Sequence, residues 1–163
     1  MGLLKHLVIH CTFTPPEMDV TKRHLWLWHF DQNGWDRYGY TDLLKRDGSI
    51  INLTKHSEDQ YVENYEMTWG AKGFNSISRH VCLEGGKLKD NITPTKLMEF
   101  FELFTESQYF LLQNYVKDFL FHHHEHADIA GHNNFTDKKL CPGFDVQDFL
   151  PLIGVPEENI YIS

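Results

Sequence analysis

Residues 3–12 read LLKHLVIHCT, an apolar run that ends in a histidine and a cysteine. Turn-prone residues flank the run and its length suits one strand, so we predict a strand from Leu3 that ends at His10. Residues 12–16, TFTPP, contain two prolines and are expected to form a loop. The strand therefore brings His10 to the edge of a sheet, next to a loop.

The rest of the chain alternates between strand patterns and helix patterns. The predicted elements are a helix with Asp19 as N-cap through Phe30, a hairpin over 39–53 with Asp47-Gly48 in its turn, a strand over 78–83, helices from Thr93-Pro94 to Phe121 with a break at Thr105, a strand over 127–130 and a helix over 145–150. Strands interleaved with helices predict the α/β class. We expect a single domain, 1–163, with a mixed central β-sheet flanked by helices.

The composition restricts the classes of protein to which the chain can belong. Its 15 Lys and Arg against 23 Asp and Glu give a net charge of −8, and 41% of its residues are hydrophobic. The acidic balance argues against binding to nucleic acid or to anionic membranes, and the apolar content excludes a disordered chain. No run reaches the ~18 apolar residues of a membrane span, and the first residues lack the pattern of a secretory signal. We expect a monomer made in the cytoplasm.

Histidine and cysteine are the unusual part of this composition. The three cysteines are odd in number and widely spaced, which is not the pattern of a disulfide framework. His10, His132 and Cys141 each stand at a predicted strand end or in a loop beyond one. Three such ligands with an open fourth position are typical of a catalytic zinc site. By spacing alone, hydrogen-bonded histidines and a core cysteine remain the alternative interpretation.

A wider set of motifs resembles a known family. In chain order, these motifs are VIHCT at 8–12, WHFDQNGW at 28–35, YGYTDLLKRDGSI at 38–50, GAKGFN at 70–75, VCLEGG at 81–86 and KKLCPGFDV at 138–146. Together they resemble the zinc-dependent N-acetylmuramoyl-L-alanine amidases of the type-2 family, which include phage amidase-type lysozymes and the peptidoglycan recognition proteins. The resemblance implies that family's fold and its reaction, hydrolysis of the amide between N-acetylmuramic acid and the L-alanine of the stem peptide. It also implies bacterial peptidoglycan or a muropeptide as the partner.

The resemblance implies roles for individual residues. His10, His132 and Cys141 match the family's three Zn²⁺ ligands. Tyr40 matches a tyrosine next to the attacking water, and Lys139 matches a lysine that stabilises the oxyanion. A cation placed where charge develops lowers the barrier to amide hydrolysis, which agrees with the role of the lysine.

The loop that contains GAKGFN is expected to contact the substrate. We assign substrate binding there to Trp69 and Asn75. Upstream, Trp26, Trp28 and Trp35 lie in or just after the predicted first helix and are expected to pack against the sheet.

The chain also departs from the family pattern. Thr41 and Gly70 stand where family members often have histidine, and the family's Ser-Ile-Gly strand reads Ser78-Arg79-His80. These departures concern the substrate groove rather than the metal. Glu84, at the end of the same strand, is a second carboxylate candidate for the site, but we expect it to be a solvated charge.

Other functions remain open at this level. The run HHHEH at 122–126 contains the inverted zinc-peptidase motif, but we expect it to end a helix. Members of this family that have lost the metal only bind muropeptide, and a binding module is therefore one alternative. This chain has Cys141 and so keeps all three metal ligands. A zinc peptidase that cuts within the stem peptide and a regulator that binds a polymerase are further alternatives. We predict a bacteriolytic, endolysin-like amidase that acts on the cell wall after release or delivery.

Overall fold

Two buried strands form the centre of the computed structural model, which describes residues 1–163. Strands β2 (His6–Cys11) and β6 (Ser78–Leu83) run parallel, with His6 opposite Ser78 and Cys11 opposite Leu83. Both strands are buried along their whole length. This burial on both faces is typical of a parallel sheet covered by other elements.

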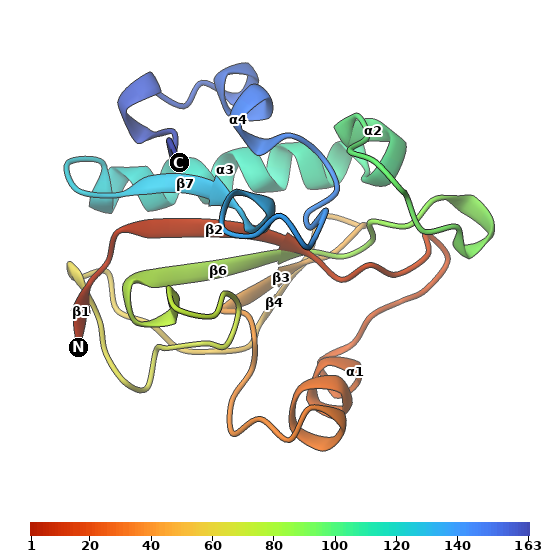
Figure 1. Ribbon diagram of the computed structural model, residues 1–163, viewed down its shortest axis with the longest axis horizontal. Helices are drawn as coiled ribbons and strands as arrows, with labels where there is room; N and C mark the ends of the chain where they lie inside the picture. The colour runs from red at the N-terminus through yellow and green to blue at the C-terminus, as the bar shows by residue number, and fades with distance from the viewer.

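The sheet has five strands and is mixed, as predicted. Strand order is β4–β3–β6–β2–β7, in which β3 (Asp42–Leu44) and β7 (Asp128–Gly131) are parallel to their inner neighbours. Strand β4 (Ile50–Asn52) pairs antiparallel with β3, as the hairpin signal indicated. Figure 1 shows α3 and α4 on one side of the sheet and α1 on the other.

The long helix α3 (Glu106–His123) covers one face with a single stripe of side chains. Thr105 is its N-cap and accepts a hydrogen bond from the Gln108 backbone N–H, at the break that the sequence predicted. The stripe repeats every three or four residues and consists of Gln108, Leu112, Val116, Phe119 and His123. The Gln108 amide donates to the carbonyls of Leu44 and Glu84, at 3.1 and 2.8 Å, and so ties the helix to the ends of two strands.

The remaining elements are short. They are β1 (Gly2–Leu3) and β5 (Tyr61–Val62), which form a separate two-stranded sheet, the helices α1 (Lys22–Trp26), α2 (Phe100–Leu103) and α4 (Val146–Phe149), the π-helix η1 (Leu27–Gln32), and the 3₁₀ turns η2 (Asn75–Ile77), η3 (Lys89–Asn91), η4 (His132–Asn134), η5 (Leu150–Ile153) and η6 (Glu157–Asn159). None of the helices combines the length and the apolarity that a membrane crossing requires.

Two predicted helix starts are wrong, each because a tertiary contact competes with the local signal. The first helix begins at Lys22 with Thr21 as N-cap, because the Asp19 carboxylate pairs with Lys45 instead of capping. The segment from Thr93 forms no helix until Phe100, and the Met98 N–H donates to the Gly143 carbonyl at 2.8 Å. A bond to a distant loop thus replaces the first predicted turns of helix.

The first predicted strand is also split in two. Residues 2–3 pair with β5, and the Leu4 N–H donates to the Gln60 carbonyl at 2.8 Å. Only from His6 does the chain join the main sheet. Sequence periodicity does not reveal this change of partner, because both halves of the run are apolar.

Candidate metal centre and substrate cavity

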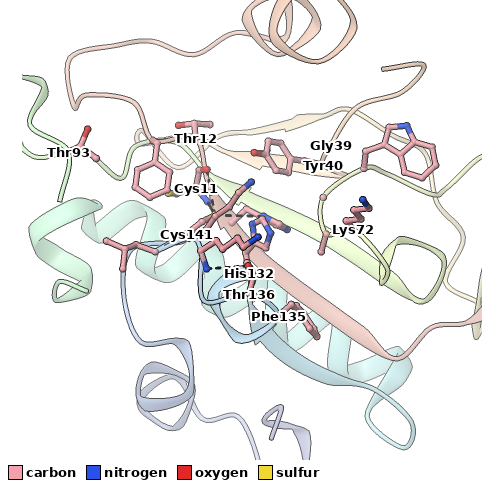
Figure 2. A pocket seen from close by; sticks show the side chains of 18 of the residues that line it. Cys11, Thr12, Gly39, Tyr40, Lys72, Thr93, His132, Phe135, Thr136 and Cys141 are labelled. Atoms are coloured by element: carbon pink, nitrogen blue, oxygen red, sulfur yellow. Dashed lines mark hydrogen bonds between the residues drawn. The ribbon is translucent and has the colours of Figure 1, made fainter. Parts of the chain in front are cut away.

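A cavity of about 810 Å³ opens at the carboxyl ends of the parallel strands, where ligands of open α/β sheets commonly bind. His10 and Cys11 reach it from β2, and His132 follows β7 directly. Figure 2 shows His132 and Cys141 near the centre of the cavity, between Thr93 on one side and Lys72 on the other. The strand ends therefore bring together residues that are more than 120 positions apart in the chain.

The structure brings the three predicted metal ligands together. One donor atom from each of His10, His132 and Cys141 lies within 4.8 Å of the others. His10 Nδ1 is 3.8 Å from Cys141 Sγ, and the His10 and His132 ring centroids are 4.7 Å apart. The Asn133 N–H donates to the Cys141 carbonyl at 2.8 Å, which folds the loop back and sets the cysteine beside His132.

The electrostatics of the cluster favour the protonation states that ligate metals. Burial raises the pKa of the Cys141 thiol, but contacts with Cys11, His10 and His132 outweigh it and bring that pKa well below its ordinary value. The Cys11 backbone N–H, 3.3 Å from Cys141 Sγ, also points at the sulfur. Burial lowers the pKa of His10, so its ring is neutral. A thiolate beside neutral imidazoles is a donor set for zinc.

The spacing of the donors agrees with that assignment. In a tetrahedral zinc site with bonds of about 2.0–2.3 Å, neighbouring ligand atoms lie about 3.3–3.7 Å apart. The 3.8 Å between His10 Nδ1 and Cys141 Sγ needs little adjustment. The cluster contains three donors and opens onto the cavity, which leaves a fourth position accessible. No other group of three His, Cys, Asp or Glu side chains meets in this way.

Tyr40 lies at the wall of the cavity beside the cluster. Its ring centroid is 5.3 Å from that of His10. Burial raises the pKa of Tyr40 well above its ordinary value, so the hydroxyl keeps its proton. The Gly39 N–H donates to His29 Nδ1 at 3.2 Å, which holds the backbone just before Tyr40. His29 itself is buried.

Three lysines give this part of an acidic protein a local positive charge. Lys139 lines the cavity together with Lys138 and Lys72, and all three side chains are exposed. Lys139, for which the sequence predicts an oxyanion role, lines the same cavity as Cys141. Lys72 and Lys138 were not among the predicted site residues, although they lie within the motifs GAKGFN and KKLCPGFDV.

Two tryptophans form another part of the cavity wall. Trp69 lines it, and its Nε1–H donates to the Asp36 carboxylate at 2.8 Å while the Arg37 guanidinium lies over its ring at 4.8 Å. Trp35 also lines the cavity and stacks on His29, so its predicted packing against the sheet is wrong. The structure does not bring Asn75 to the cavity.

The Asn75 side chain has a different environment. Its Oδ1 accepts a hydrogen bond from the Ala71 N–H at 2.8 Å and closes the loop over 71–75. The two other tryptophans also differ from each other. Trp28 packs against the smaller hydrophobic cluster as predicted, whereas Trp26 is half exposed and stacks on Phe30.

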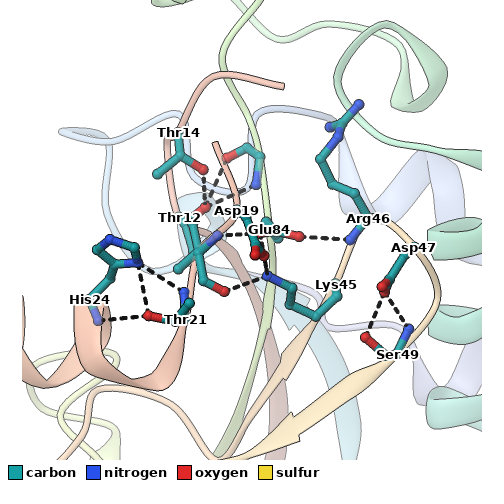
Figure 3. A network of polar contacts seen from close by, with 12 residues as sticks. Thr12, Thr14, Asp19, Thr21, His24, Lys45, Arg46, Asp47, Ser49 and Glu84 are labelled. Carbon is teal, nitrogen blue, oxygen red and sulfur yellow. Dashed lines mark hydrogen bonds and ion pairs between the residues drawn. The ribbon is translucent and has the colours of Figure 1, made fainter. Parts of the chain in front are cut away.

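Glu84 is not the solvated charge that the sequence suggested. It is buried and accepts hydrogen bonds from Lys45 Nζ at 2.7 Å and from the backbone N–H groups of Val20 and Arg46 at 2.6 and 2.8 Å. Figure 3 shows this network between the segment before α1 and the strand ends. The local sequence does not show that a charged residue at the end of a strand is buried. The pairing of Glu84 with Lys45 depends on a tertiary contact between distant segments.

The histidine run at 122–126 forms no metal cluster. Helix α3 ends at His123, whose side chain is fully buried, and His126 lies in the following turn. The prediction that this run ends a helix is confirmed. Burial, followed by the charge of Arg79, lowers the pKa of His123 to about 4.

Comparisons with known proteins agree with this geometry. The sequence profile of the N-acetylmuramoyl-L-alanine amidase family matches residues 3–144. The endolysin of Escherichia phage T7 is 33% identical over 148 residues, which cover 86% of this chain and 82% of the relative.

Two solved structures have the same fold. The amidase LysC from Clostridium intestinale gives a TM-score of 0.67 at 16% identity and covers 95% of this chain and 88% of its own. Drosophila PGRP-LB gives a TM-score of 0.62 at 17% identity, with 92% and 81% covered. These similarities confirm the predicted fold class.

Proposed function

Since the chain belongs to the N-acetylmuramoyl-L-alanine amidase family and is an endolysin-type amidase of peptidoglycan, we propose that His10, His132 and Cys141 bind a catalytic zinc ion. The observation that carries the proposal is the meeting of three donor atoms within 4.8 Å at the wall of an open cavity. The bond that is cut joins the lactyl group of N-acetylmuramic acid to the L-alanine of the stem peptide.

The residues around the cluster have separate tasks in this proposal. When bound, zinc supplies a Lewis acid that polarises the amide carbonyl and makes water acidic enough to attack near neutral pH. The Lys139 ammonium stabilises the negative charge that develops on the carbonyl oxygen. Tyr40 keeps its proton and positions the attacking water by a hydrogen bond from its hydroxyl. Both side chains line the same cavity as the cluster, which supports these roles.

The cavity wall suggests how the substrate is held. Trp69 offers an aromatic face whose edge is fixed by Asp36, so it binds substrate with little loss of side-chain freedom. Asn75 contributes to substrate binding through the shape of its loop. Lys72 and Lys138 face the cavity and match the carboxylates of a stem peptide in an otherwise acidic protein.

The wider setting of the protein follows from the same family. We propose that residues 1–163 form one amidase domain that works as a monomer. The endolysins among its relatives support a site of action at the bacterial cell wall, reached after release from the cytoplasm.

The deciding experiment is mass spectrometry of purified peptidoglycan after digestion. We expect free stem peptides that begin at L-alanine, lost when a chelator removes metal and restored by added Zn²⁺. Products cut within the stem would instead indicate a peptidase. Bound muropeptide without products would indicate a binding module.

A pair of cysteine variants tests the metal ligands. Cys141→Ala should lose both zinc retention and activity, because two imidazoles alone bind zinc weakly. Cys82→Ala is the matched control, since Cys82 is an equally buried thiol that does not belong to the donor cluster. Full activity in Cys141→Ala would show that the metal assignment is wrong.

A further inference from the structure

The two ring nitrogens of His10 face different partners. Nδ1 lies 3.8 Å from Cys141 Sγ, and Nε2 lies 2.9 Å from Nδ1 of His80. His80 is in the middle of β6 opposite Val8, so it projects from the same face of the sheet as His10. Its side chain is fully buried. His80 is therefore the polar group that holds the side of the His10 ring turned away from Cys141.

The backbone around His80 is built to accommodate this ring. A Cβ atom on Gly70 would lie 2.4 Å from Nδ1 and 2.5 Å from Cγ of His80, and 2.8 Å from the Gly39 carbonyl oxygen. Any side chain at position 70 would therefore displace His80. The Thr41 N–H donates to the His80 carbonyl at 2.7 Å and fixes its place along the strand. The glycine and the histidine thus form one packing unit beside the metal ligand.

The position of the hydrogen on His10 decides which ring donates the hydrogen bond between His10 Nε2 and His80 Nδ1. A neutral imidazole carries one N–H and one lone pair. If His10 Nδ1 offers its lone pair to a metal, Nε2 must carry the hydrogen, and a buried N–H needs an acceptor. Nδ1 of His80 is the atom within reach. A hydrogen bond in the opposite direction would put the proton on His10 Nδ1 and block ligation.

We propose that His80 is a positioning residue of the metal centre: its Nδ1 accepts the hydrogen bond from His10 Nε2–H and fixes the tautomer and orientation in which His10 binds the metal. Ligating histidines commonly donate their second N–H to a carboxylate or a carbonyl. Here an imidazole takes that place. This inference rests on the proposed function, because it presupposes that His10 is a ligand.

The environment of His80 Nε2 indicates that His80 does more than fill buried space. With Nδ1 as acceptor, the neutral ring carries its hydrogen on Nε2, and that buried atom has no hydrogen-bond partner in the protein. Leaving a buried donor unpaired is unfavourable. An apolar side chain of similar size would fill the space without that penalty. The imidazole is therefore explained by its contact with His10 rather than by packing.

Two substitutions that branch alike at Cγ separate the hydrogen bond from the packing. In His80→Asn, the side-chain carbonyl can take the position of Nδ1 and accept from His10. In His80→Leu, a methyl group takes that position. We expect His80→Leu to weaken Zn²⁺ affinity by about 10–100-fold in competition with a chromophoric chelator, and His80→Asn to recover most of that loss. His123→Leu is the control, because it removes another fully buried histidine that is not a member of the donor cluster.

The outcomes distinguish this inference from the proposed function. Equal zinc affinities for wild type and His80→Leu, or an Asn variant no better than the Leu variant, would overturn the role of His80. If Cys141→Ala binds zinc as tightly as wild type, the metal assignment itself fails. Urea unfolding of each metal-free variant shows whether an affinity change reflects loss of the fold.

A measurement on the unaltered protein covers the case in which both variants unfold. Long-range ¹H–¹⁵N NMR correlations identify which nitrogen of each histidine carries hydrogen. In the zinc-loaded protein we expect hydrogen on Nε2 of His10 and no hydrogen on Nδ1 of His80. A protonated Nδ1 on His80 would refute the proposal, whatever the variants do.

Discussion

The buried ion pair between Lys45 and Glu84 provides the sharpest test of how the fold supports the site. The side chains are 9% and 3% exposed, and the two charged groups are 2.7 Å apart. Asp19 contacts the same ammonium but is 82% exposed. The pair joins the segment that leads from the cavity residue Thr12 into α1 to the ends of β3 and β6, as Figure 3 shows.

The magnitude follows from what each substitution leaves behind. Glu84→Gln leaves a buried ammonium whose remaining carboxylate partner is solvated, and its amide turns a donor toward the Arg46 N–H, so we expect a loss of about 3–5 kcal/mol in unfolding free energy. Lys45→Met leaves a buried carboxylate with two N–H donors and is also destabilising. Asp19→Asn should lose less than about 1 kcal/mol, because its charge is already in water.

The assay is urea unfolding of the metal-free protein. With a denaturant slope of about 2 kcal/mol per molar, Glu84→Gln should lower the midpoint by about 1.5–2.5 M. The double variant Glu84→Gln/Lys45→Met buries no isolated charge and should lose about 1–3 kcal/mol less than the sum of the single variants. Additive losses, or a Glu84→Gln loss no larger than that of Asp19→Asn, would refute the reasoning.

Three further predictions concern the site and the response to pH. Lys139→Ala should keep its zinc but lose about 10²–10³-fold in kcat, measured by release of stem peptides, and an unchanged kcat would contradict the oxyanion role. Trp69→Ala should raise KM about 3–10-fold, whereas Trp26→Ala, outside the cavity, should not. Burial lowers the pKa of His29 to about 4, and burial with the charge of Arg79 does the same to His123. From pH about 6.5 down to about 4 the unfolded chain gains protons that the folded chain does not, so urea midpoints should fall with pH in that window, and His123→Gln should show a shallower fall.

Much of the fold could be predicted because its signals are local. The strand over 78–83 before Gly85-Gly86, the Asp-Gly turn between β3 and β4, and the cap at Thr105 each depend on neighbours in sequence. The strand-end positions of His10 and His132 also follow from where apolar runs stop. These two histidines then meet at one edge of the sheet because their strands are parallel.

Other features were decided only by tertiary contacts. The start of α1 depends on the Asp19 contact with Lys45, and the burial of Glu84 depends on backbone groups from two other segments. The contact between His10 and His80 exists because Gly70, in a distant loop, leaves room for the ring.

The physical reason for the division is the range of the interactions. Periodicity, caps and turn residues act within a few positions, so the amino-acid sequence alone determined the strands of the main sheet, the long helix and the set of chemically capable residues. Desolvation and pairing of charges depend on which segments meet in space. The tertiary structure therefore decided which histidines, carboxylates and lysines are buried, paired or open to the cavity.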